Sequence, residues 1–81
     1  MNFEVYPNPT VGPFTVELPS TIQGETQIRI VDLQGRILYQ QELSSDHRGP
    51  IAIDLSDKNT GMYLVQWITN EQVQSQRIIV E

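Results

Sequence analysis

The sequence predicts an all-β protein folded as an antiparallel β-sandwich, and two observations carry this prediction. Apolar and polar residues alternate along several short runs, which is typical of strands with one buried face. Residues that favour turns separate these runs at intervals of roughly 8–12 residues, the spacing found in β-sandwiches. No stretch shows the 3.6-residue period of an amphipathic helix.

Seven strands are expected from this alternation. In the second run, Phe14, Val16 and Leu18 share one face and polar residues stand between them. The run over residues 62–69 is apolar on both faces, which favours a strand in the middle of a sheet. The expected strands span residues 3–6, 13–18, 26–32, 36–43, 50–55, 62–69 and 72–80.

Turns account for the segments between the strands. At residues 32–35 (DLQG), Asp32 can accept a hydrogen bond from the following backbone and Gly35 can take a positive φ. The other expected connections are PNPTVG at 7–12, PSTIQGET at 19–26, SSDHRGP at 44–50, SDKNTG at 56–61 and TNEQ at 69–72.

The Pro7-Asn8-Pro9 corner follows the first strand directly. Each proline fixes φ and removes a backbone donor, and Asn8 between them is pushed towards extended geometry. Such a segment is a stiff end to an edge strand, and it discourages pairing with another chain.

Length and composition set the number of domains and exclude several classes of function. The chain has 81 residues and no cysteine, so we expect one domain, residues 1–81, without a disulfide or a Cys-ligated metal. We interpret it as the tail of a longer protein. Ten acidic residues against five basic ones argue against nucleic-acid binding. No apolar run approaches the ~20 residues of a membrane span, and the first residues do not resemble a signal peptide.

The sequence predicts no enzyme. Asp46 and His47 lie side by side in a polar loop next to Ser44 and Ser45, whereas a nucleophile and its base converge from separate parts of a fold. We therefore expect no catalytic residue and no cofactor.

Besides an enzyme, a weak ion-binding site is the other alternative that the residues raise. Asp54, Asp57 and Asn59 are spaced 1, 4, 6, unlike the 1, 3, 5 pattern of an EF-hand loop. The competing interpretation is a solvated turn around Lys58, and we assign no metal ligand.

Four motifs in order carry a resemblance to a known family. They are VYPNPTVGPFTVEL at 5–18, IRIVDLQGRIL at 28–38, IDLSDKNTGMYLVQW at 53–67 and QRIIVE at 76–81. Together they resemble the C-terminal sorting domain of type IX secretion cargo, also called the Por secretion system C-terminal sorting domain, from Val5 to Val80. The positions that match the family pattern are Tyr6, Pro7, Asn8, Pro9, Gly12, Asp32, Gly35, Arg36, Gly61, Tyr63 and Arg77.

The resemblance implies a seven-stranded immunoglobulin-like sandwich at the end of exported proteins of Bacteroidota. It implies passage through the periplasm, recognition by the outer-membrane translocation machinery, and a secreted or cell-surface location. It also implies removal by a sortase-like peptidase that cuts upstream of Tyr6 and attaches some cargo to an anionic lipopolysaccharide. The family often ends in lysine, whereas Glu81 stands here.

The terminal strand is the predicted site of partner recognition. Its residues Arg77, Ile78, Ile79 and Val80 would be captured by β-strand addition if they lie at an open sheet edge; otherwise they simply complete the sandwich. An open edge would also allow two copies to exchange strands as a homodimer.

Secondary recognition candidates come from two other motifs. They are Arg36 and Gly61. The remaining motif positions (Tyr6, Pro7, Asn8, Pro9, Gly12, Asp32, Gly35 and Tyr63) are interpreted as structural.

The rival function is an immunoglobulin-like spacer or a carbohydrate-binding accessory module of a secreted protein. Such a module would need an exposed aromatic platform, for which only Trp67 and three tyrosines are present.

Overall fold

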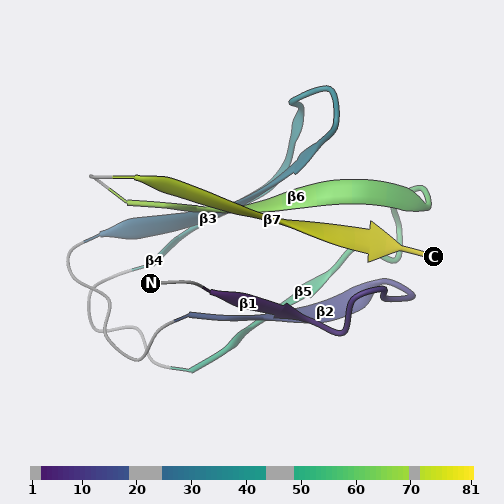
Figure 1. The fold of residues 1–81 in the computed structure, drawn as a ribbon, viewed down its shortest axis with the longest axis horizontal. Coiled ribbons are helices and arrows are strands. Elements are labelled where there is room, and N and C mark those ends of the chain that lie inside the picture. Colours follow the sequence, from purple (N-terminus) through teal and green to yellow (C-terminus); the bar gives the residue numbers. More distant parts are fainter. Residues whose placement is uncertain (1–2, 19–24, 44–48, 70–71) are drawn as a thin grey trace.

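Two antiparallel sheets packed face to face form the protein (Figure 1). This computed structural model describes residues 3–18, 25–43, 49–69 and 72–81. The three-stranded sheet has the order β1 (Glu4–Tyr6), β2 (Pro13–Glu17), β5 (Ile51–Asp54). The four-stranded sheet has the order β4 (Ile37–Leu43), β3 (Thr26–Asp32), β6 (Gly61–Ile68), β7 (Val73–Val80).

The observed strands confirm the predicted all-β sandwich. Each strand begins and ends within one residue of its predicted bounds, and no helix occurs among the described residues. The doubly apolar run is β6, which lies between β3 and β7, as its pattern predicts.

The core lies between the two sheets and comes from the alternating residues of both. Each large apolar side chain buried there contributes roughly 1.5–3 kcal/mol. Tyr63 and Trp67 share the core face of β6, as predicted. The core residues are Phe3, Phe14, Val16, Ile28, Ile30, Leu43, Ile51, Ile53, Leu55, Tyr63, Val65, Trp67, Ile78 and Val80.

Hydrogen bonds and a ring contact fix one end of the core. The Trp67 indole Nε1–H donates to Thr26 Oγ1 at 2.5 Å, and Thr26 Oγ1–H donates to the Ile68 carbonyl at 2.8 Å. The Phe3 ring stands edge-on to Trp67, with centroids 6.0 Å apart. The buried indole is thus satisfied, and the start of the chain is anchored at this end.

The two ends of the sandwich carry different segments. The C-terminus, the β1–β2 connection and the β5–β6 connection lie at one end, the β3–β4 turn projects from the top of the view, and β1 begins towards the other end (Figure 1). We call the first of these the motif end, because the family-like motifs reach it. The predicted loop residues Ser44, Ser45, Asp46 and His47 lie outside the described part of the chain.

Candidate recognition surface

The first motif begins where β1 ends. β1 is an edge strand of the three-stranded sheet, and Pro7 and Pro9 follow it directly, as predicted. The Tyr6–Pro7 and Asn8–Pro9 peptide bonds are cis. Tyr6 donates its hydroxyl hydrogen to Glu17 Oε2 at 2.5 Å, and this hydrogen bond raises the pKa of the phenol.

Asn8 reaches from this corner to the outer edge of β7. Its Nδ2 donates to the Arg77 carbonyl at 2.9 Å, and its Oδ1 accepts from the Ile79 amide at 3.1 Å. The side-chain amide therefore offers one donor and one acceptor, as a peptide unit of a neighbouring strand would.

Thr10 continues the pairing along β7. Its amide donates to the Ile79 carbonyl and its carbonyl accepts from the Glu81 amide, both at 2.8 Å, which makes a short parallel bridge with Val80. The Thr10 hydroxyl donates to the Pro13 carbonyl at 2.5 Å and accepts from the Gly12 amide at 3.1 Å. Thr10 is itself buried, so the corner is packed into the sandwich.

These contacts bear on the predicted capture of the terminal strand by a partner. β7 lies at a sheet edge, as strand capture requires. However, Asn8 and Thr10 already form hydrogen bonds with its backbone amides and carbonyls from Arg77 to Glu81. Strand addition there would first require the corner to leave. Capture of β7 and strand exchange between copies stay predictions.

Asn8→Asp should destabilise the domain by about 1 kcal/mol at neutral pH, because a carboxylate cannot donate to the Arg77 carbonyl. A protonated carboxyl group can both donate and accept. The neutral form is thus preferred in the folded state, so the lost stability should return as the pH falls below the pKa of the new group. Urea unfolding at several pH values would measure this.

Asn8→Ala is the matched control, since it should lose both hydrogen bonds at every pH. An Asn8→Asp deficit that does not shrink relative to Asn8→Ala in acid would contradict the assigned bonding.

The side chains of β7 divide between two faces. Ile78 is fully buried and Val80 is 3% exposed in the core. Arg77 is exposed, and Ile79 is 39% exposed on the outer face. Of the four predicted recognition residues, Arg77 and Ile79 therefore present side chains while the sandwich is intact.

The Asp32–Arg36 turn has the predicted geometry. Gly35 has a φ of 87°, and Asp32 Oδ1 accepts from the Gln34 and Arg36 amides, each at 2.9 Å. The Arg36 Nε also bonds Asp32 Oδ2 at 2.7 Å. The hydrogen bond from the Arg36 backbone is the main reason that the pKa of Asp32 lies below its usual value. The Arg36 side chain is 73% exposed, so this ion pair adds little stability.

A shallow hollow separates this turn from the start of β6. It has a volume of about 310 Å³. Arg36 and Gly61 both line it, so the two secondary candidates lie at one place. Gly61 has a φ of 149° and pairs across the sheet with Val80 of β7. The Tyr63 hydroxyl donates to the Asn59 carbonyl and holds the preceding loop against the core.

The carboxylates of the β5–β6 connection are used locally. Asp54 Oδ1 accepts from the Ser56 amide at 2.8 Å, and hydrogen bonds from the Ser56 hydroxyl and amide lower the pKa of Asp54. Asp57 lies 4.0 Å from Lys58. Within the described ranges no three acidic or histidine side chains gather as metal ligands would. The weak ion site stays untested.

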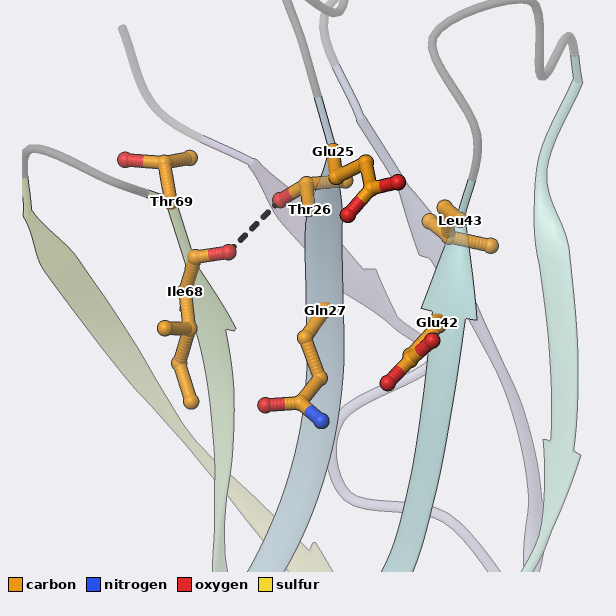
Figure 2. Close-up of a pocket in the computed structure, with 7 residues that line it drawn as sticks. All are labelled: Glu25, Thr26, Gln27, Glu42, Leu43, Ile68 and Thr69. Carbon is orange, nitrogen blue, oxygen red and sulfur yellow. Dashed lines mark hydrogen bonds between the residues drawn. The ribbon is translucent and has the colours of Figure 1, made fainter.

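A second hollow, at the opposite end of the four-stranded sheet, was not predicted from the sequence. It has a volume of about 440 Å³ (Figure 2). Its lining residues are Glu25, Thr26, Gln27, Glu42, Leu43, Ile68 and Thr69. None of the predicted recognition residues lies there, and its threonine hydroxyl at position 26 is engaged with the Ile68 carbonyl.

Comparison with known proteins assigns the family. Residues 4–81 match the profile of the secretion system C-terminal sorting domain. Over 78 residues the chain is 36% identical to the ulvan lyase NLR42 of Nonlabens ulvanivorans; the match covers 94% of this chain and 14% of the lyase. No helix of the described residues is long and apolar enough to cross a membrane. The chain therefore belongs to the type IX secretion C-terminal sorting domain family, and it is the sorting domain of a secreted or cell-surface protein.

Proposed function

We propose that the outer-membrane translocation machinery recognises this domain in its folded state, through the motif end of the sandwich. The observation that carries the proposal is that motif residues far apart in sequence are held together there. Asn8 bonds the backbone of Arg77 and Ile79, some 70 positions later, and Arg36 and Gly61 line one hollow nearby. A linear terminal peptide would present none of this arrangement.

The direction of the chain suits this role. Phe3, just before β1, packs against Trp67 near the end of β6, and β1 begins away from the C-terminus (Figure 1). A cargo joined upstream would extend from there and leave the motif end accessible. Cleavage upstream of Tyr6 by the sortase-like peptidase would then release the cargo after it has crossed the periplasm and outer membrane, and some cargo would be joined to lipopolysaccharide. The domain itself would need no catalytic residue or cofactor.

A carbohydrate-binding module receives less support from the surface. Such sites stack sugars on exposed aromatic rings, yet Trp67 and Tyr63 are 6% and 7% exposed. Tyr39 is half-buried, and Tyr6 is exposed but bonded to Glu17.

A secretion assay tests the proposal. Residues 1–81 would be fused behind a linker to a periplasm-targeted reporter, in a host with a type IX system. We expect the reporter at the cell surface or in the medium. A fusion to an unrelated immunoglobulin-like domain of similar size should remain in the periplasm. Retention of both fusions, each folded, would contradict the sorting function.

A further inference from the structure

The outer face of the four-stranded sheet is divided into polar and apolar rows. Strand register aligns Gln40, Arg29, Gln66 and Ser75 in a fully polar row across the sheet. Towards the motif end, beyond a shift in the β3–β4 register between Ile30 and Val31, the next row consists of Ile37, Val31, Leu64 and Arg77. The row after that pairs Met62 with Ile79. Side chains directly opposite each other on a sheet face lie in contact range, so these two rows form one band.

The band lies outside the core. Val31 is only 6% exposed and is not part of the core cluster between the sheets, to which Ile28 and Ile30 of the same strand belong. Ile37 is 52% exposed and Ile79 is 39% exposed. We call residues Val31, Ile37, Met62, Leu64, Arg77 and Ile79 the outer band.

The proline corner adds an exposed apolar residue next to the segment that pairs with β7. Thr10 bridges Val80, and both are buried, so the corner adds a short segment beside β7. Val11, the next residue, is 75% exposed. The row from Ile37 on β4 to Arg77 on β7 therefore spans three strand spacings, a width of roughly 14 Å, and the corner lies beside β7.

Arg77 places an unneutralised charge in this apolar surface. The ion pairs found among the described residues are Arg36–Asp32 and Lys58–Asp57, so no described carboxylate neutralises Arg77. The chain has twice as many acidic as basic residues, so many carboxylates are available, and yet Arg77 is not paired with one in the described structure.

Arg29 gives the same face a second cation. It lies in the adjacent polar row, and its Nε is buried without a hydrogen-bond partner in the described structure. Its Nη2 donates to Gln27 Oε1 at 3.3 Å. The opposite face of the sandwich carries exposed Glu4, Glu17 and Asp54 on the three-stranded sheet, whereas the outer face of the four-stranded sheet carries Glu42 as well as the two arginines.

We propose that the outer band is the docking surface of this domain and that its partner is a protein surface whose apolar side chains surround a carboxylate. The carboxylate pairs with Arg77, and the apolar side chains cover Ile37, Leu64 and Ile79. Arginine at the centre of a well-packed, desolvated contact is a typical energetic hot spot of protein interfaces, and the surrounding apolar contacts exclude water from it. This inference rests on the proposed sorting function and names the face through which it acts.

The reporter fusion of the full chain tests it with three variants. Arg77→Glu reverses the charge and should lower the secreted amount about tenfold, as expected for loss of an interface hot spot. Ile79→Thr removes apolar contact but keeps a β-branched residue, and it should lower the secreted amount less than Arg77→Glu does. Arg77→Lys keeps the charge and should retain most secretion. Purified variants should melt at the temperature of the parent domain, since both positions face outward.

Ser75→Glu is the matched control. Ser75 lies on the same strand and the same face as Arg77, but in the polar row, so secretion should be unchanged. A host suppressor of Arg77→Glu should replace an acidic residue of a secretion component with a basic one, which would identify the partner carboxylate.

The outcomes separate the two proposals. Normal secretion of Arg77→Glu, with the parent fusion also secreted, would overturn the docking surface and leave the sorting function intact. Retention of the parent fusion would instead overturn the sorting function itself. A parent domain that is dimeric by sizing and becomes monomeric with Arg77→Glu would show that the band binds a second copy, and would overturn the assigned partner.

Discussion

Replacing Ile78 with alanine should destabilise the domain by about 2–5 kcal/mol, whereas Ile79→Thr should change its stability by less than about 1 kcal/mol. The two residues are neighbours on β7, but Ile78 is fully buried in the core and Ile79 is 39% exposed on the outer face. Truncation of Ile78 leaves a cavity between the sheets, while Ile79 borders solvent. Urea unfolding of the purified domain would measure both changes.

A graded control strengthens the comparison. Ile78→Val removes one methylene and should cost only about 0.5–1.5 kcal/mol. Equal losses for Ile78→Ala and Ile79→Thr would show that the two faces of β7 are assigned incorrectly. The pair also separates folding from recognition, because Ile78→Ala should reduce secretion through loss of the fold, whereas Ile79→Thr should reduce it to a smaller degree in a domain that stays folded.

Among the glycines that the structure describes, Gly12→Ala should be the most disruptive substitution, with a loss of about 3 kcal/mol from over-packing and backbone strain together. An added Cβ would lie 2.6 Å from the Cβ and 2.8 Å from the Cα of Ser56. The φ of Gly12 is 142°, a region that side chains rarely adopt. Ser56 cannot easily retreat, because the Leu55 amide donates to the Gly12 carbonyl at 3.1 Å.

Gly35→Ala provides the control, measured by the same thermal or urea unfolding. Gly35 also has a positive φ, 87°, but an added Cβ would meet no atom within 4 Å. The free energy of unfolding of Gly35→Ala should therefore fall only by the cost of the backbone conformation, about 1–2 kcal/mol. A Gly12→Ala loss no larger than this would mean that the close approach to Ser56 relaxes at little cost.

Local pattern explains why the strands and one turn could be predicted. A strand with one buried face must alternate, and β6, apolar on both faces, had to lie inside a sheet. The Asp32–Gly35 geometry depends on residues only a few positions apart, so it too was predictable.

The composite site could not be predicted in the same way, because it depends on which strands become neighbours. The sequence alone suggested an open edge at β7 and a stiff corner after β1, but not that Asn8 of the corner would pair with that edge. The outer band likewise requires the register that aligns Ile37 with Arg77 across four strands. Neither relation leaves a periodic signal in the chain.

The proline corner near the start of the domain can be held in place only when β7, the last strand, is present, because its hydrogen bonds are made to β7. β7 supplies Ile78 and Val80 to the core and the backbone partners of Asn8 and Thr10. Contacts this distant in sequence form late, since the intervening chain must be made and brought together first. A product truncated before β7 has neither a closed sandwich nor an outer band. The folded motif end therefore requires that the chain has been made through β7.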